Sequence, residues 1–244
     1  MRLEDATDVF CRSFAFTRNF THPFEFVRVG GLRIMRDATP RREPRTQEIV
    51  VCGLDPGDAM RQIEAYDPPR HAVCLAMGIA AAGQAMLEQK DAYKAGGYRF
   101  LGSEDFFVRD LSLPIEPPPQ ETKRVLTVVE AERVAKAAGA RQILPDQLGG
   151  NQVRLYASWN GDSPVGWVRS IHVGSESAWA SNLHVKPEFR RRGIGKALMA
   201  KMLEDDAAAG AKYNVLLASR AGSILYPQVG YEKIGVLLIF AKKR

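Results

Sequence analysis

A proline-rich segment in the middle of the 244-residue chain constrains its organisation more than any other feature. Residues 114–120 have the sequence PIEPPPQ. Three consecutive prolines hold the backbone extended and cannot lie inside a helix or a central strand, because proline fixes φ and lacks an N–H donor. A chain of this length accommodates one large or two small domains. We therefore predict a linker here, between domains formed by residues 1–115 and 120–244.

The composition is that of a globular protein. Hydrophobic residues make up 45% of the chain and charged residues 25%, which excludes a disordered chain, a collagen and a disulfide scaffold. No apolar run reaches the roughly 18–20 residues of a membrane span, and the charged N-terminus lacks the apolar core of a signal peptide. Cys11, Cys52 and Cys74 are odd in number and widely spaced, which is typical of reduced thiols, and the four histidines show no metal-ligand spacing. We expect a cytoplasmic protein with no membrane partner and no metal.

The basic residues are concentrated in the second half of the chain. Residues 1–119 contain 15 Lys and Arg against 17 Asp and Glu, whereas residues 120–244 contain 19 against 11. Such an excess suits an anionic ligand, either nucleic acid or a phosphorylated cofactor. A basic surface that only maintains solubility accounts for the same excess, and the charge balance leaves both possibilities open.

Both halves alternate short apolar runs with amphipathic segments, which predicts a mixed α/β fold. The first half is predicted to form a hairpin at residues 24–35, strands at 48–52, 71–77 and 106–111, and helices at 55–66 and 80–93. The second half is predicted to form strands at 125–129, 152–159, 165–173, 178–185, 213–218 and 235–241, and helices at 130–138, 193–209 and from 221. The first half contains no phosphate loop, paired carboxylates or nucleophile motif. Residues that bind a ligand or take part in catalysis are therefore expected in the second half.

The segment 183–196 (LHVKPEFRRRGIGK) combines three features that favour an anion. An apolar strand leads into a loop with three arginines, and the loop opens directly onto a helix. The first turn of a helix has unpaired N–H groups and a partial positive charge. Gly193 and Gly195 let a diphosphate approach the main chain, and the arginines add charge-assisted hydrogen bonds. The pattern is neither a Walker loop nor a Rossmann glycine motif.

This segment resembles motif A of the GNAT N-acetyltransferase superfamily. In that motif an Arg or Gln is followed three residues later by a Gly and five residues later by a Gly or Ala. Arg190, Gly193 and Gly195 stand at those positions, after a strand that ends in Leu183 and Val185. Downstream, residues 217–231 (LASRAGSILYPQVGY) are similar to a later motif of the family, at a family-like spacing. The resemblance implies a GNAT acyltransferase fold for residues 120–244.

The resemblance also implies a co-substrate, acetyl-CoA, and a set of residues that bind it. The strand residues Leu183, His184 and Val185 correspond to those whose backbone groups bind the acetyl and pantetheine parts. Ser219 stands where many members have an asparagine that bonds pantetheine. The pyrophosphate is expected at the loop and first helical turn, formed by Arg190, Arg191, Arg192, Gly193, Ile194, Gly195 and Lys196.

For catalysis, the resemblance implies a role for Tyr226. Tyr226 matches the tyrosine that protonates the departing thiolate, and a packing role is its alternative. No Asp or Glu lies at 178–185, so the usual general base is missing. The nearby ionisable side chains are those of Glu176, His172 and His184, each of which also suits a solvated or structural role.

The alternation of side chains along a strand gives a further expectation for residues 178–185. It places Trp179 and Ser181 on the face of Leu183 and Val185, next to the acetyl group, with Asn182 on the other face as a structural hydrogen-bonding residue.

The first half has a strand–helix order like that of the second but lacks the arginine–glycine motif. We interpret it either as a degenerate GNAT-like domain or as an unrelated α+β domain.

The predicted function is transfer of an acetyl group from acetyl-CoA to a primary amine of a small molecule. A protein amine as acceptor and a non-catalytic CoA-binding module are the alternatives. Nucleic-acid binding through residues 190–192 and 242–244 lacks a recognition helix or an aromatic platform, so no nucleic-acid partner is predicted. A monomer and a homodimer are equally compatible with the sequence.

Overall fold

The computed structural model describes residues 1–81, 83–118, 120–174, 176–219 and 222–243. It contains two compact units, each built from separate stretches of chain. Unit 1 comprises residues 1–107, 217–220 and 233–244, and unit 2 comprises 108–216 and 221–232. Unit 1 therefore draws on both ends of the chain. The predicted domains 1–115 and 120–244 stay a prediction.

Unit 1 contains a mixed sheet in the order β1-β2-β3-β4-β11-β5. The strands are β1 (Phe24–Val29), β2 (Leu32–Asp37), β3 (Gln47–Cys52), β4 (His71–Gly78), β5 (Tyr98–Asp110) and β11 (Glu232–Lys242). Strands β1 and β2 form the predicted hairpin, whose turn has Gly30 at φ 57°. β11 pairs antiparallel with β4 from Gly235–Gly78 to Ala241–Ala72, so the end of the chain completes this sheet.

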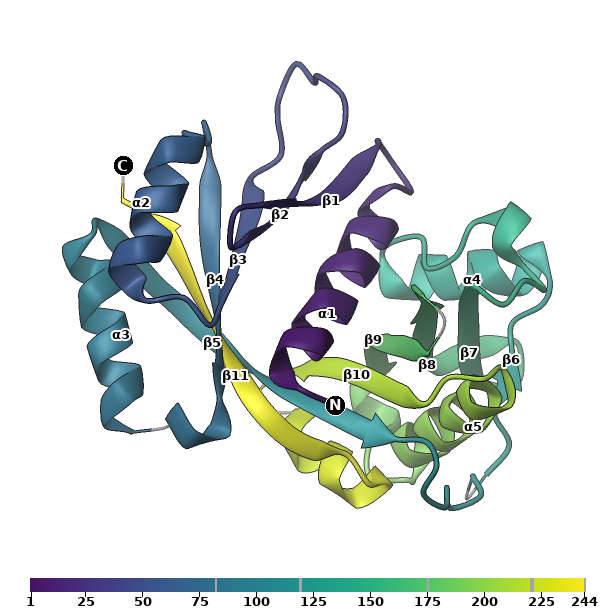
Figure 1. The fold of residues 1–244 in the computed structure, drawn as a ribbon. Helices are drawn as coiled ribbons and strands as arrows, with labels where there is room; N and C mark the ends of the chain where they lie inside the picture. The colour runs from purple at the N-terminus through teal and green to yellow at the C-terminus, as the bar shows by residue number, and fades with distance from the viewer. Residues whose placement is uncertain (82, 119, 175, 220–221, 244) are drawn as a thin grey trace. The chain divides into compact units, whose positions relative to one another are not determined.

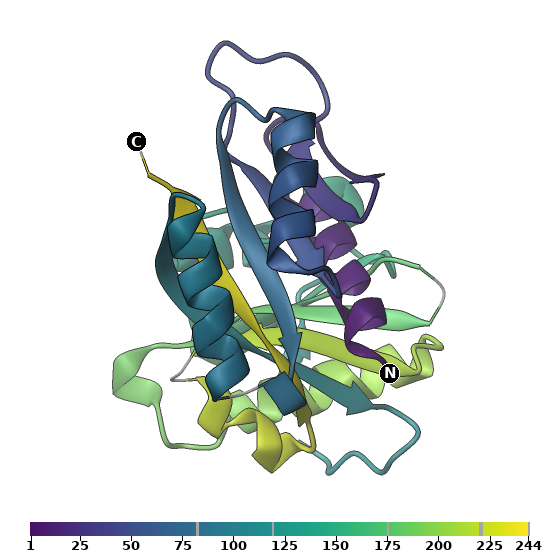
Figure 2. The same cartoon turned by 60° about the vertical axis from the view of Figure 1, so that its left-hand side comes forward.

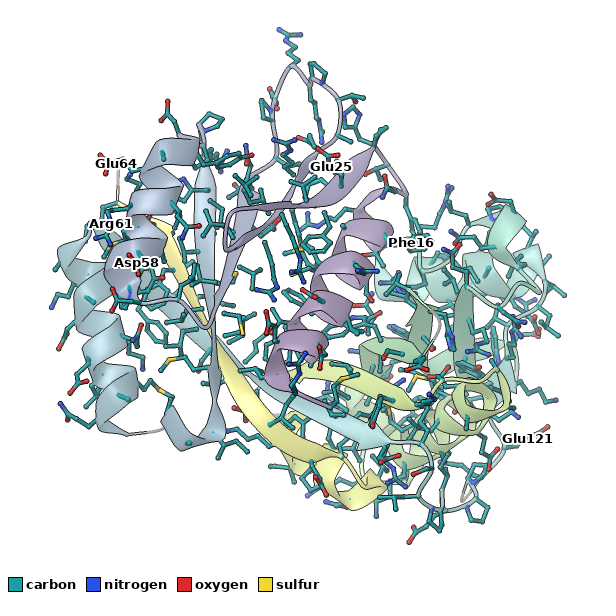
Figure 3. The ribbon with its side chains drawn as sticks, viewed as in Figure 1. Phe16, Glu25, Asp58, Arg61, Glu64 and Glu121 are labelled. Carbon is teal, nitrogen blue, oxygen red and sulfur yellow. The ribbon has the colours of Figure 1, made fainter. Side chains whose placement is uncertain are left out.

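Helices cover both faces of the unit 1 sheet (Figures 1 and 2). Helices α2 (Pro56–Tyr66) and α3 (Gln84–Ala95) lie on one face, and α1 (Leu3–Arg18) lies on the other. Ala59 and Ile63 of α2 are buried in a core with alternate residues of β3 and β4. Figure 3 shows Asp58, Arg61 and Glu64 on the outer side of α2, as expected for an amphipathic helix.

Unit 2 contains strands in the order β10-β9-β8-β7-β6. They are β6 (Lys123–Arg124), β7 (Val153–Asn160), β8 (Ser163–His172), β9 (Ser177–Val185) and β10 (Tyr213–Ala218). Helix α5 (Ile194–Ala208) packs so closely on β8 that a Cβ at Gly166 would lie 3.0 Å from Ile194 and 3.1 Å from Leu198. Helix α4 (Val128–Ala138) lies on the opposite face of these strands (Figure 1).

The mixed α/β class is confirmed, and four details differ from the sequence predictions. The predicted strand 125–129 is wrong, because Thr127 and Glu130 form a capping box that starts α4 at Val128. The short helix predicted from 221, a residue outside the described set, is replaced by the 3₁₀ turns η4 (Gly222–Ile224) and η5 (Tyr226–Val229). Helix α1 was not predicted, and β5 starts eight residues earlier than expected. Across the described residues, no helix is both long and apolar enough to cross a membrane.

Candidate functional site

Strands β9 and β10 separate after a short stretch of pairing. They run parallel and pair only at their beginnings, from Ser177–Tyr213 to Trp179–Val215. Within the described chain, no ladder joins the rest of β9, residues 180–185, to β10, although β8 still pairs with its other edge. An edge without a ladder presents backbone N–H and C=O groups to a ligand. The carboxyl-terminal half of β9 therefore provides hydrogen-bonding groups next to an opening in the sheet.

A β-bulge in β9 decides which side chains face each side of this opening. Trp167 of β8 pairs with His184, but Arg169 pairs with Ser181, so β9 contains one extra residue between them. Asn182 has φ 55° at this point, and its amide donates to Gln142 Oε1 at 2.9 Å. The structural hydrogen bond expected of Asn182 is therefore present.

The bulge overturns the predicted sharing of faces in β9. Ser181 accepts a hydrogen bond from Arg169 Nε at 3.1 Å, and the ring of His184 stacks on Trp167 with centroids 4.7 Å apart. Trp179, Ser181 and His184 thus share one face, whereas Leu183 and Val185 lie on the face of α5. The prediction that placed Trp179 and Ser181 with Leu183 and Val185 is wrong, because strict alternation fails where one residue is inserted.

The arginine loop is held by its own backbone and leaves its charges at the surface. Arg190 Nε donates to Val185 O at 2.9 Å, and Arg192 donates to Glu188 O at 3.0 Å. Arg190, Arg191 and Arg192 are all exposed. Arg191 (φ 59°) and Gly193 (φ 81°) both adopt left-handed backbone conformations, which bring the chain round to the start of α5. The loop therefore connects the end of β9 to the head of α5 within a few residues.

The first turn of α5 has open hydrogen-bond donors. Gly193 is the N-cap and has no side chain to cap the helix. The first backbone bond runs from Ala197 N–H to Gly193 O at 3.0 Å. For the amides of Gly193 to Lys196, the described residues provide no acceptor. Four such donors, the helix dipole and the arginines are the features that suit an anion, and the binding of one here stays a prediction.

Unit 1 contains the same strand–helix–strand arrangement without these two features. Strands β3 and β4 are paired over their whole length, from Gln47–His71 to Cys52–Ala76, so no opening separates them. The helix between them, α2, is capped by Asp55, whose carboxylate accepts from Gly57 N–H at 2.8 Å. A carboxylate at this helix terminus occupies a donor and repels an anion. The open strand edge and the uncapped helix start thus belong to unit 2, the part of the chain in which the sequence predicts the anion site.

Tyr226 lies at the start of η5, close to α5. Its side chain is buried, and its ring packs edge-on against Tyr231 with centroids 5.7 Å apart. A Cβ at Gly195 would lie 3.2 Å from Leu225, which shows why a glycine is needed where this turn meets α5. Ser219 follows β10 directly, is exposed and belongs to unit 1. The roles assigned to Tyr226 and Ser219 stay predictions.

The three candidate bases occupy different places. His172 Nε2 lies 3.1 Å from the buried carboxylate of Asp206, which also accepts from Arg154, Ser170 and Asn214, so His172 belongs to a structural network. Glu176 precedes β9 and forms an exposed ion pair with Lys212 at 2.5 Å. His184 alone of the three lies in the carboxyl-terminal half of β9. Its pKa is lowered by burial and, to a smaller extent, by the positive charges of Arg190 and Lys186.

Two side chains that line the face of His184 were not singled out from the sequence. Trp167 stacks on His184, and Arg169 is buried beside Ser181, where desolvation lowers its pKa to about 10. The alternation of β8 carried a signal for them, since residues 167 and 169 fall on one face. Their position opposite β9 depended on the bulge.

The sequence around this opening matches a known domain. Residues 151–233, about a third of the chain, match the model of the acetyltransferase (GNAT) domain. This segment is a GNAT domain. Its enzyme class is acyltransferase, as the motif resemblance implied. A comparison with curated proteins found no match.

Solved structures share the fold of this chain over most of its length. A GCN5-related N-acetyltransferase from Kribbella flavida is 14% identical, covers 98% of this chain and 95% of its own, and has a TM-score of 0.65. One from Sphaerobacter thermophilus is 16% identical, with 88% and 82% covered and a TM-score of 0.55. A tandem GNAT protein from the clavulanic acid biosynthesis pathway is 13% identical, with 88% and 80% covered and a TM-score of 0.50. At these identities the likeness establishes the fold.

The described part of the chain holds no cluster of three His, Cys, Asp or Glu side chains that suits a metal ion. Cys11 and Cys74 are buried and Cys52 is partly buried, and all three thiols are free. Burial raises the pKa of the Cys74 thiol to about 12, so it stays protonated at neutral pH.

Proposed function

We propose that this chain transfers an acetyl group from acetyl-CoA to a primary amine of a small molecule. The observation that supports this most strongly is the opening between β9 and β10, located beside the uncapped head of α5. A molecule that joins a diphosphate to a thin, amide-containing arm fits this arrangement. The diphosphate meets the N–H groups of Gly193 to Lys196, and the arm meets the unpaired backbone of β9.

Acetyl-CoA supplies an activated thioester, and the residues of this chain bind and orient it. The N–H groups of β9 that point to its open edge, that of Val185 among them, are proposed to donate to the thioester oxygen, where negative charge develops when the amine attacks. Arg190 to Arg192 contribute attraction for the phosphates from the loop, where all three are exposed.

His184 is proposed to accept the proton of the attacking amine. It lies on the face of the strand opposite α5, and its lowered pKa keeps the imidazole neutral at pH 7. Tyr226 is proposed to donate a proton to the departing thiolate, for which a phenol has a suitable pKa. The two groups come from different elements, His184 from β9 and Tyr226 from η5.

The small size of the acceptor, the cytoplasmic location and the choice between monomer and homodimer stay predictions, as does the absence of a nucleic-acid partner. The likeness to a protein described as a tandem GNAT supports the interpretation of unit 1 as a second, degenerate GNAT-like domain. The fully paired β3 and β4 fit a domain that lacks a cofactor site of its own.

Calorimetric titration with acetyl-CoA, CoA and ATP tests the proposal. We expect acetyl-CoA to bind at one site per chain and more tightly than ATP, because ATP lacks the pantetheine arm that pairs with β9. A screen of small amines with the acetyl-CoA-bound protein should then yield CoA release. Failure of acetyl-CoA to bind would overturn the proposal, and binding without turnover on any amine would favour a non-catalytic module.

A further inference from the structure

A cavity of about 440 Å³ lies beside α5 in unit 2, outside the opening between β9 and β10. Its walls are α5, the proline-rich segment at residues 114–117 and the turn at residues 227–230. Lys196, Ala200 and Leu203 form the wall contributed by α5. The volume lies in the range of small-molecule sites rather than that of a single bound ion.

Arg109, near the end of β5, is the buried charge that lines this cavity. It is 6% exposed. Its Nη2 donates to Pro114 O at 2.5 Å and to Leu113 O at 3.4 Å. Over the part of the chain that the structure describes, Nε and Nη1 meet no acceptor, and no carboxylate lies within 4.0 Å of the guanidinium. A Cβ at Gly230 would lie 2.9 Å from its Cζ, so the backbone there packs against the guanidinium.

Arg109 differs in this respect from two other buried arginines, Arg33 and Arg154, whereas the buried Arg169 donates to Ser181 and to Gln142 O. Arg33 is 3% exposed and pairs with Asp8 at 2.6 Å and with Glu4 at 3.0 Å. Arg154 is 2% exposed and pairs with Asp206 at 2.7 Å. A buried guanidinium is stable when a negative charge compensates its desolvation. Arg109 has no such partner among the described residues, which indicates that the partner is a ligand.

The other charges at the cavity favour an anion at Arg109. Lys196 adds a second positive charge from the first turn of α5, and Glu116 contributes one exposed carboxylate from the proline-rich segment. The nearest acidic neighbour in sequence, Asp110, is partly buried and accepts hydrogen bonds from Ser112. These bonds and, to a smaller extent, the charge of Arg109 lower the pKa of Asp110, but the two side chains form no ion pair.

Apolar side chains complete the walls and suit a flat ring. They come from the proline-rich segment, from α5 and from the turn after Tyr226, and include Pro114, Pro117, Leu203, Pro227 and Val229. Lys196 belongs both to this cavity and to the helical turn with the open N–H groups, so one ligand can reach both. A ligand whose diphosphate binds at the N-terminus of α5 can extend the group attached to that diphosphate along the wall formed by Lys196, Ala200 and Leu203.

We propose that this cavity binds the phosphate monoester of a nucleotide, with Arg109 as its charge partner. The 3′-phosphate of CoA is one source, and this version rests on the proposed function. A separate nucleotide that carries a phosphate monoester has the same chemistry and is the second source. In both cases the proline-rich segment acts as a wall of a ligand site, because Pro114 O holds the guanidinium of Arg109 in place.

The test compares CoA, dephospho-CoA and adenosine 3′,5′-bisphosphate by calorimetry on the full chain. We expect removal of the 3′-phosphate to weaken binding of CoA at least tenfold. Arg109→Gln should weaken CoA to the level of dephospho-CoA and leave dephospho-CoA unchanged. Arg133→Gln is the matched control, because Arg133 is an exposed arginine of unit 2 that pairs with Asp162 and lies outside this cavity.

The outcomes separate the possibilities. The site takes a separate nucleotide if two results are found. CoA and dephospho-CoA then bind with equal affinity, and adenosine 3′,5′-bisphosphate binds to the CoA-bound protein but not to the Arg109→Gln variant. If the 3′-phosphate makes no difference and the bisphosphate does not bind, the cavity proposal is overturned, although bound acetyl-CoA would leave the proposed function intact. If acetyl-CoA fails to bind while the bisphosphate binds through Arg109, the proposed function falls and the cavity proposal stands. Because Arg109→Gln can disturb folding, the wild-type comparison of CoA with dephospho-CoA decides the matter without a variant.

Discussion

The imidazole of His184 stacks on the indole of Trp167, with ring centroids 4.7 Å apart and 22° between the planes. This contact exists because the bulge at Asn182 brings His184 opposite Trp167 across the β8–β9 pair. It fixes the imidazole on the face away from α5, at the part of β9 that has no ladder to β10 among the described residues. The stacking also contributes to the burial that lowers the pKa of His184.

We expect His184→Gln to lower kcat about 100-fold with little change in acetyl-CoA affinity, because glutamine cannot accept the proton. The pKa of His184 lies below its ordinary value of 6.5, so the neutral form that accepts a proton is lost only as the pH falls below that value. The wild-type pH profile of kcat/KM should therefore fall on the acidic side, and the variant should lack this limb. His22→Gln, at a partly exposed histidine of unit 1, is the control. An acidic limb that persists in His184→Gln would remove this residue from the mechanism.

Substitutions at Gly193 test the predicted anion site at the N-terminus of α5. Because Gly193 has φ 81°, Gly193→Ala strains the backbone by about 1–2 kcal/mol and disturbs the open donors, so binding of acetyl-CoA should weaken. Gly193→Glu adds a negative charge there and should abolish binding. Gly139, the C-cap of α4 at φ 69°, provides the matched control. Gly139→Ala should lower the free energy of unfolding in urea by a similar amount, while titration still shows normal acetyl-CoA affinity. If Gly193→Ala, Gly193→Glu and Gly139→Ala all bind acetyl-CoA equally well, the phosphate site is refuted.

Two neighbouring tyrosines should respond in opposite ways to loss of the hydroxyl. Tyr226→Phe is expected to lower kcat by about 10-fold to 10⁴-fold at nearly constant acetyl-CoA affinity, because the donor to the thiolate is lost. Tyr231 is buried and donates to Asn214 Oδ1 at 2.6 Å. Tyr231→Phe should therefore reduce the free energy of unfolding by about 1–3 kcal/mol and keep kcat. Steady-state kinetics together with urea unfolding distinguish the two variants. If the chemical step limits the rate and Tyr226→Phe has a normal kcat, Tyr226 is not the general acid.

Glu48 on β3 should make the stability of the protein depend on pH. Burial raises its pKa from 4.5 to about 7, although Arg18 lies 3.4 Å away. The folded state therefore binds the proton more tightly than the unfolded state, and stability from this group is highest below pH 4.5 and is lost as pH rises to about 7.

Glu48→Gln should remove this dependence and make the variant more stable than the wild type at pH 8, by up to about 3 kcal/mol. Urea unfolding from pH 4 to 8 measures the difference. Glu25→Gln, at a half-exposed carboxylate of β1 that pairs with Arg36, is the control and should keep the wild-type pH dependence (Figure 3). A wild-type curve that rises between pH 5 and 8 while Glu48→Gln is flat would contradict the sign.

The elements predicted correctly are those whose start and end signals lie within the element. Helix α2 begins after Asp55, which caps it as expected, and the hairpin of β1 and β2 turns at glycines. Helix α1 lacks such a signal: the side chain of Arg2 at its N-cap forms no capping hydrogen bond, and the buried face of α1 includes Thr7 and Ser13. The strand predicted at 125–129 failed because an apolar run outweighed the capping pair Thr127 and Glu130, although that pair was visible in the sequence.

The sequence by itself determined the arginine loop and the uncapped start of α5 within 183–196, because glycines, arginines and a helix start act over a few consecutive residues. The tertiary structure decided which strands pair, where β9 and β10 separate, and that β11 joins β4 in unit 1. It also decided the face of His184, since a bulge depends on the register between two strands, and the burial of Arg109 against Pro114. These features depend on contacts between residues far apart in the chain. The free energy of such a contact depends on both segments together, so the sequence of one segment does not determine it.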